Sequence, residues 1–176
     1  MMTCNFSTIP VLGFAAASGT GKTTLLTQVL PLLNAAGLRV GLVKHSHHDF
    51  DIDHAGKDSF RLREAGATPV VLVSKYRRAI IEEFYHQTEP ELASQLALFS
   101  PDQVDLILVE GFRSEAFAKI ELHRPSLKQV LLYPNDSNII ALASDSVIDV
   151  PANLPLLDLN QPAEIAAFIL HTFLKL

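Results

Sequence analysis

Short apolar segments alternate with amphipathic segments along the chain. The clearest apolar runs are residues 11–15 (Val-Leu-Gly-Phe-Ala) and residues 105–110 (Asp-Leu-Ile-Leu-Val-Glu). In residues 90–99 and 162–174, apolar side chains recur at the spacing of one face of a helix. Continuous apolar strands that are bounded by helices are typical of a mostly parallel sheet covered on both faces. The pattern therefore predicts an α/β fold with a doubly wound, mostly parallel sheet and helices on both faces.

The other elements follow from the same periodicities and from the residues that end them. Gly37 and Gly66 stand where helices are expected to stop, because glycine favours the left-handed cap at a helix C-terminus. Pro31 lies inside the first expected helix and is predicted to kink or divide it. The run at 69–74 has the composition of a buried strand. The expected strands are residues 11–15, 38–44, 69–74, 78–82, 105–110, 118–122, 139–143 and 154–159, and the expected helices are residues 22–36, 58–65, 90–99 and 162–174.

A glycine-rich segment joins the first strand to the first helix. Residues 16–24 read Ala-Ala-Ser-Gly-Thr-Gly-Lys-Thr-Thr, the P-loop pattern G-x-x-x-x-G-K-[ST] with Ala16 in place of its first glycine. Such a loop turns several backbone N–H groups toward one point, and the following helix adds the positive end of its dipole. An alanine costs little there if its φ is negative, and more if the turn needs a positive φ. This motif predicts a P-loop NTPase-like form of the doubly wound fold.

Within this motif, each polar residue has an expected task. We expect the Lys22 ammonium to reach the β- and γ-phosphates and the Thr23 hydroxyl to bind Mg²⁺. The alternative is an ordinary glycine turn with a solvated lysine. The predicted nucleotide-contacting residues of the loop are Ser18, Gly19, Thr20, Gly21, Lys22, Thr23 and Thr24.

The run at 105–110 ends in an acid and resembles a Walker B strand. In a P-loop fold such a strand lies beside the first one, so its C-terminal carboxylate faces the metal or the water next to the γ-phosphate. Glu110 is the candidate for this catalytic or Mg²⁺-binding role, and Gly111 would permit close approach to the phosphate. The alternative is a core strand whose terminal acid is merely exposed.

A histidine-rich segment follows the second expected strand, Lys-His-Ser-His-His-Asp at residues 44–49. One interpretation is a switch-like loop in which Asp49 approaches the magnesium of a nucleotide. Another is a transition-metal site built from His45, His47 and His48, because imidazoles suit zinc, nickel and copper. A third is a solvated polar loop, and the residue pattern leaves all three open.

Composition narrows the possible functions. The chain has 176 residues, and we expect one nucleotide-binding domain over residues 1–176. A net charge of −5 argues against a dedicated nucleic-acid binder. Cys4 is the only cysteine, so an internal disulfide and a multi-cysteine zinc site are excluded, which suits a reducing compartment. No apolar run approaches the roughly 18 residues of a membrane span, so we expect no membrane partner.

Strong hydrolytic machinery is missing from the sequence pattern. Ser18 lies inside the phosphate loop without evident histidine and aspartate partners, so a hydrolase triad is unsupported. Neither an arginine finger nor a water-orienting glutamine can be identified from the sequence. Hydrolysis without such help is slow, on the order of 10⁻⁴ to 10⁻³ s⁻¹. Nucleotide binding is therefore better supported than rapid turnover.

Taken in order, these motifs resemble the MobB family of molybdopterin-guanine dinucleotide biosynthesis adaptor proteins. The matching segments are residues 17–24, 44–49, 56–59, 63–67, 105–112, 119–120 and 140–145. The resemblance implies a cytoplasmic, dimeric protein that binds GTP and Mg²⁺, hydrolyses GTP weakly and assists the guanylyltransferase MobA, with the molybdenum cofactor as a further possible ligand. The Asn-Lys-x-Asp guanine signature is absent, so the choice of base rests on the resemblance. Asp145 is a candidate acceptor for the guanine N1–H and amino groups, unless it simply begins a turn.

Two other functions compete with the adaptor interpretation. A small-molecule kinase of the same fold would transfer the γ-phosphate to a metabolite and would be favoured by an arginine-rich lid, which the sequence does not clearly contain. A metal-delivery GTPase would use His45, His47 and His48. Phosphate transfer to an added metabolite and tight zinc or nickel binding are the respective tests.

Overall fold

The computed structural model describes residues 8–46, 49–86 and 89–176, and the chain divides into two compact units. Residues 1–45 and 91–176 form the sheet unit, and residues 46–90 form the hairpin unit. The sequence predicts one domain over residues 1–176, and this stays a prediction.

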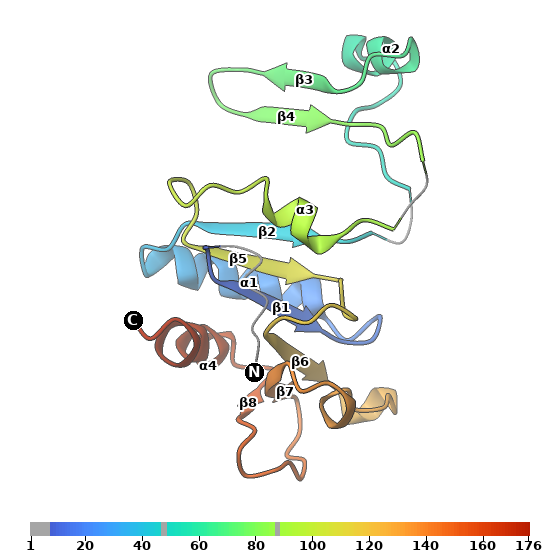
Figure 1. Cartoon of the computed structure of the whole chain (residues 1–176). Helices are drawn as coiled ribbons and strands as arrows, with labels where there is room; N and C mark the ends of the chain where they lie inside the picture. The colour runs from blue at the N-terminus through green and yellow to red at the C-terminus, as the bar shows by residue number, and fades with distance from the viewer. Residues whose placement is uncertain (1–7, 47–48, 87–88) are drawn as a thin grey trace. The chain divides into compact units, whose positions relative to one another are not determined.

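A parallel six-stranded sheet forms the centre of the sheet unit (Figure 1). Every neighbouring pair in it is parallel, in the order β2-β5-β1-β6-β7-β8. Because β1 lies between β5 and β6, the connections run outward in both directions from the middle of the sheet, as in a doubly wound fold. The strands are β1 (Val11–Ala15), β2 (Val40–Lys44), β5 (Leu106–Glu110), β6 (Lys119–His123), β7 (Ile139–Ser144) and β8 (Leu156–Asp158).

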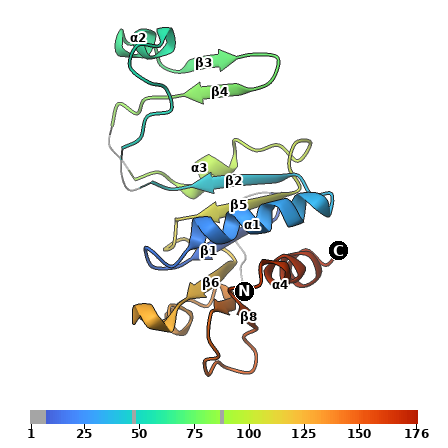
Figure 2. The same ribbon diagram turned by 180° about the vertical axis from the view of Figure 1, so that it is seen from behind.

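Helices cover both faces of this sheet (Figures 1 and 2). Helix α1 (Lys22–Ala35) and helix α4 (Pro162–Ala167), which continues as a π-helical segment Phe168–Phe173, pack on one face, and helix α3 (Leu92–Leu96) packs on the other. Alternation along β5 sends Leu106 and Leu108 to the first face and Ile107 and Val109 to the second. The predicted two-faced α/β architecture is confirmed. Two 3₁₀ turns, Pro125–Leu127 and Tyr133–Asn135, lie between β6 and β7.

Helix α1 ends as its sequence predicts, and of the two effects expected of Pro31, a kink or a division, the division does not occur. Gly37 has a φ of +89°, and its N–H donates to the Asn34 carbonyl while the Leu38 N–H donates to the Leu33 carbonyl. These two bonds form a Schellman cap, which satisfies carbonyls at the helix end. The helix is not divided at Pro31, because one unbroken element spans Lys22–Ala35. Burial of Val29 and Leu33, each contributing about 1.5–3 kcal/mol, supports the continuous helix against that proline.

The hairpin unit contains helix α2 (Asp58–Glu64) and an antiparallel pair, β3 (Val70–Val73) and β4 (Arg78–Ile81). The prediction of a buried strand at 69–74 is wrong, since the Val73 side chain is 77% exposed. The physical reason is local pairing: the Ser74 N–H donates to the Arg77 carbonyl and turns the chain back on itself. An apolar run by itself does not reveal whether a second layer covers it.

One arginine organises the acidic side chains of the hairpin unit. The Arg63 guanidinium pairs with Asp51 at 2.9 Å, Asp53 at 3.1 Å and Glu83 at 2.7 Å. These carboxylates hold the pKa of Arg63 above its ordinary value, Glu83 most strongly. Asp51 and Asp53 are therefore occupied by a structural ion-pair network. No helix in the described part of the chain is both long and apolar enough to cross a membrane.

Candidate functional site

The phosphate loop has the backbone curvature that its glycines allow. Gly19 and Gly21 have φ values of +79° and +100°, a region that glycine enters without a steric penalty. The Thr20 hydroxyl donates to the Ala17 carbonyl at 2.9 Å and closes the turn. Ala16 does not have a positive φ, so alanine introduces no left-handed strain there. The departure from the usual glycine is thus accommodated by the loop.

Lys22 begins helix α1 and folds back over the loop. Its Nζ donates to the carbonyl oxygens of Ala16 and Ala17, both at 3.1 Å. The N-cap residue of the helix is Gly21, which has no side chain to occupy the first-turn N–H groups. These groups and the positive end of the helix dipole are therefore available to an anion held beside the Lys22 ammonium.

Several charges surround the Lys22 ammonium. Burial lowers the pKa of Lys22 below its ordinary value, and the Glu110 carboxylate opposes this by raising the pKa. The positive side chains of Arg113 and Lys44 lower the pKa further. Three cations close to one carboxylate make an electrostatic environment that attracts a polyphosphate. A bound polyphosphate would in turn raise the pKa of Lys22 by favouring its charged form.

Lys44, at the end of β2, connects two residues that the sequence assigns to magnesium. Its ammonium lies 3.3 Å from Glu110 Oε2 and 3.5 Å from Thr23 Oγ1. The connection follows from strand order, because β2 pairs directly with β5 and Lys44 is in register with Glu110. A hydroxyl and a carboxylate supply the oxygen ligands that Mg²⁺ prefers. The Lys44 ammonium already lies between Thr23 and Glu110, so a positive charge is favoured at this point. The two oxygen donors therefore fit Mg²⁺, which would neutralise phosphate charge there.

Arg124, just after β6, joins the phosphate loop to Asp145. Its Nε donates to the Thr20 carbonyl at 2.9 Å, and its Nη1 lies 2.7 Å from Asp145 Oδ2. Asp145 therefore lies near the loop, as a base-recognising residue would. Its carboxylate is also engaged by an arginine, so the assignment to guanine stays a prediction.

The backbone conformation and the surroundings of position 111 explain why glycine is needed there. Its φ is +105°, and a Cβ at this position would lie 2.5 Å from the Cβ of His45. The next residue, Phe112, has a φ of +50°, and its ring stacks on His45 with centroids 4.8 Å apart. Gly111 thus allows β2 and β5 to continue side by side past their ends. Its predicted contact with phosphate remains a prediction.

Asp49 belongs to the hairpin unit, where its Oδ1 accepts the Phe50 N–H at 2.9 Å. Its catalytic and Mg²⁺-binding roles stay predictions. Of the histidines proposed for a transition metal, His47 and His48 lie outside the described residues, and His45 stacks on Phe112. Within the described residues, no group of three or more His, Cys, Asp or Glu side chains is placed to hold a metal ion.

Sequence reasoning assigned no role to three basic residues near the phosphate loop: Lys44, Arg113 and Arg124. Each lies at or just beyond the C-terminal end of a strand that neighbours β1 or β5. The C-terminal edge of a doubly wound sheet is where ligands bind. A cation at or just after the end of an expected strand is the sequence signal that could have made each of them a candidate, although the sequence does not show which strand ends meet at the loop.

The fold and the phosphate loop define an α/β protein of the P-loop NTPase-like class. Residues 11–145 match the family model of MobB, molybdopterin guanine dinucleotide synthesis protein B. The chain belongs to the MobB family.

Individual relatives agree with this membership. The chain is 44% identical to the molybdopterin-guanine dinucleotide biosynthesis adapter protein of Escherichia coli (strain K12), with 95% of each chain covered. It is 40% identical to the protein of that name from Haemophilus influenzae (strain ATCC 51907 / DSM 11121 / KW20 / Rd), covering 94% of this chain and 92% of the relative.

Solved structures have the same fold. A crystal structure of molybdopterin-guanine biosynthesis protein B (mobB) is 27% identical, with a TM-score of 0.70 over 92% of this chain and 99% of that one. Bacillus subtilis MobB is 21% identical, with a TM-score of 0.72 over 92% of this chain and 96% of that one, which supports the fold alone.

Proposed function

We propose that this protein is a GTP-binding, Mg²⁺-dependent adaptor in molybdopterin guanine dinucleotide biosynthesis. The observation that carries the proposal is the convergence of Lys22, Thr23, Lys44 and Glu110 around the glycine turn at the C-terminal edge of the sheet. A triphosphate in this loop would contact the α1 N-terminus and the Lys22 ammonium. Mg²⁺ would then be held by Thr23 and Glu110.

The partner in the proposal is a MobA-type guanylyltransferase. The two curated relatives are named adapter proteins of molybdopterin-guanine dinucleotide biosynthesis, which supports a role beside another protein of the same synthesis. GTP is the nucleotide that a guanylyltransferase consumes, so an adaptor that holds GTP suits this reaction. A cytoplasmic location and the molybdenum cofactor as a further ligand belong to the same proposal.

Guanine preference is proposed for Asp145. A carboxylate beside the phosphate loop is suited to accept the N1–H and amino hydrogens of guanine, whereas adenine lacks this pair of donors. Arg124 would hold the carboxylate in position through their 2.7 Å ion pair. Hydrolysis is proposed to be slow, with Glu110 orienting the water.

A homodimer is also part of the proposal. Val71 and Ile80 are paired across β3 and β4, and with Val73 they form an apolar face of the hairpin. Their exposed fractions are 52%, 55% and 77%. Contiguous exposed apolar surface is typical of an interaction site. Sedimentation of the wild type and of Val73→Lys tests the proposed dimer, which the charged side chain should weaken. A monomeric wild type would contradict the proposal.

Lys22→Ala tests the nucleotide site. We expect GTP binding, measured by calorimetry with Mg²⁺, to fall below detection, because the ammonium that pairs with the phosphates is lost. Circular dichroism and thermal melting should stay close to wild type. Lys175→Ala removes an exposed lysine from the same unit and is the matched control. Unchanged GTP affinity in Lys22→Ala would reject the site, and tighter binding of ATP than of GTP would reject the base assignment.

A further inference from the structure

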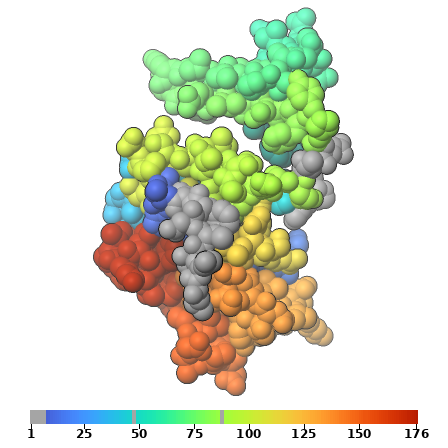
Figure 3. Space-filling view, in the orientation of Figure 1, coloured from blue at the N-terminus to red at the C-terminus, as the bar shows by residue number. Residues whose placement is uncertain are grey.

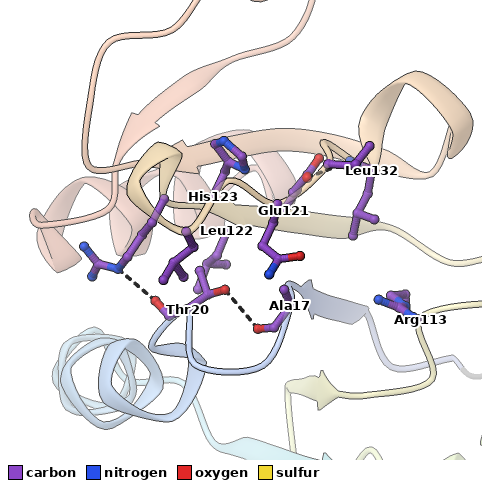
Figure 4. A pocket seen from close by; sticks show the side chains of 11 residues that line it. Ala17, Thr20, Arg113, Glu121, Leu122, His123 and Leu132 are labelled. Carbon is purple, nitrogen blue, oxygen red and sulfur yellow. Dashed lines mark hydrogen bonds between the residues drawn. The ribbon is translucent and has the colours of Figure 1, made fainter.

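Two cavities of the sheet unit share part of their lining. The first, about 210 Å³, lies between the phosphate loop at Thr20 and the end of β6 (Figure 4). The second, about 490 Å³, extends from Arg113 to residues 135–138. Arg113, Val130 and Leu132 line both, so the two cavities adjoin and are together called the Arg113 groove. The second cavity alone falls in the range of about 300–1,000 Å³ that is usual for ligand pockets.

A buried lysine, Lys119, holds the loop that carries Arg113 through hydrogen bonds to its backbone. The Lys119 Nζ donates to the carbonyl oxygens of Arg113 at 3.1 Å and Glu115 at 2.6 Å. Lys119 is 1% exposed and pairs with Asp136 at 2.9 Å. In the space-filling view, the yellow segment after β5 lies against the orange segment after β6 (Figure 3). Lys119 therefore links the segment of Arg113 and Glu115 to the segment of Asp136, and both segments line the groove.

The other charged residues that line the groove have partners within the protein. Both Glu121 oxygens accept backbone N–H groups, from Leu132 at 2.7 Å and Tyr133 at 2.9 Å, while burial raises the pKa of this carboxyl. Arg124 pairs with Asp145 and Asp136 with Lys119. Among the charged lining residues, Arg113 alone lacks both an ion pair and a side-chain hydrogen bond within the described chain. Its exposed guanidinium is available to an external anion.

His123 is a second polar group that lines the groove. It lines the first cavity, where Figure 4 shows it on the β6 wall opposite the phosphate loop, and it is 8% exposed. Its ring has no hydrogen bond in the part of the chain that the structure describes. Since the ring nitrogens are not among the fully buried atoms, they can be reached by a ligand in this cavity. A neutral imidazole offers one donor and one acceptor, and the side-chain amide of Gln129, which lines the same cavity, offers an NH₂ donor group and a carbonyl acceptor.

We infer that the Arg113 groove binds a second ligand beside the nucleotide, a phosphate monoester of a nitrogen heterocycle. The phosphate would pair with Arg113, whose charge also acts on Lys22, so this end lies next to the phosphate loop. The ring would lie against the apolar side chains of Val130 and Leu132 and hydrogen-bond to His123. A pterin phosphate and a second nucleotide share this chemistry. The inference rests on the proposed function, because the P-loop must take the GTP.

The test measures binding to full-length protein whose phosphate loop is filled with a non-hydrolysable GTP analogue and Mg²⁺. The probes are 6-hydroxymethylpterin monophosphate and GMP, titrated by calorimetry. We expect the pterin phosphate to bind the loaded protein, and Arg113→Gln to weaken it about tenfold, the order expected for one charge-assisted hydrogen bond. Lys175→Gln, which removes an exposed charge from the same unit, should bind like wild type. His123→Phe should also weaken binding if the variant melts like wild type.

The outcomes distinguish a pterin phosphate from a nucleotide as the ligand, and the Arg113 groove from the phosphate loop as its site. Tighter binding of GMP than of the pterin phosphate would assign the groove to a nucleotide. Binding that disappears when the GTP analogue is present, or that survives Arg113→Gln unchanged, would overturn the separate groove, as would no binding of either probe. Lys22→Ala separates the two proposals, because it should lose GTP while still binding the groove probe. If wild type fails to bind GTP but binds the pterin phosphate, only the proposed function fails.

Discussion

The Lys44 ammonium lies 3.3 Å from Oε2 of Glu110, and both residues stand at the ends of directly paired strands. The same ammonium lies 3.5 Å from the Thr23 hydroxyl. A lysine therefore lies between the two oxygen donors that we assign to Mg²⁺, and the metal would have to displace it.

Removing that lysine should make the metal easier to bind. Lys44→Met is expected to raise the apparent Mg²⁺ affinity of the GTP complex about two- to fivefold, the scale of an exposed ion pair. Metal titrations at fixed GTP concentration measure this, and Lys44→Arg, which keeps the positive charge, is the control. If Lys44→Met instead weakens GTP binding at saturating Mg²⁺, Lys44 contacts phosphate rather than competing with the metal.

Glu110→Gln should affect hydrolysis more than binding. The amide keeps the shape of the side chain but loses the charge that orients water, so we expect the single-turnover rate of GTP hydrolysis to fall about 100-fold. GTP affinity at saturating Mg²⁺ should change by less than about threefold, since most binding energy comes from the loop. The matched control is Asp105→Asn, at the residue that precedes the N-terminal end of β5. Equal hydrolysis rates in wild type and Glu110→Gln would remove the catalytic role.

Gly111→Ala should destabilise the sheet unit. The new Cβ would lie 2.5 Å from His45 Cβ, and the residue would keep a φ of +105°. Strain and overpacking together predict a loss of about 2–4 kcal/mol in the free energy of unfolding. Gly37→Ala has a similar φ of +89°, but no atom of the described residues lies within 4 Å of the added Cβ. It should lose only about 1–2 kcal/mol, the cost of the left-handed backbone. Urea denaturation compares the two, and equal losses would show that the contact with His45 is unimportant.

Acid stability should depend on the Arg39–Asp105 pair. Hydrogen bonds from the Arg39 side chain and backbone lower the pKa of Asp105 from 3.8 to about 2. Because the folded pKa lies below the unfolded one, the stabilisation is present above pH 3.8 and is lost as pH falls through about 2. Melting temperatures between pH 5 and pH 2 should fall less steeply in Asp105→Asn, which does not titrate. Parallel curves for the two proteins would show that the pair contributes nothing.

Local pattern was enough for most of the elements in the sheet unit. Residues 106–109 are apolar throughout, and the structure buries this run between two helical layers. The stop at Gly37 was predictable because glycine alone enters the left-handed cap without strain. The exposed strand at 70–73 was not predictable, since its apolar composition is the same as that of a covered strand. Only the structure shows that this run pairs with β4 in a two-stranded sheet and stays exposed.

The sequence by itself determined the phosphate loop and the strand–turn–helix around it, because these depend on neighbouring residues and on the conformational freedom of glycine. Tertiary structure alone decided which distant side chains surround that loop. The order β2-β5-β1-β6 brings the ends of four strands to one edge, and so gathers Lys44, Arg113 and Arg124 from segments far apart in the chain. Strand order arises from packing over the whole sheet, and no local pattern encodes it.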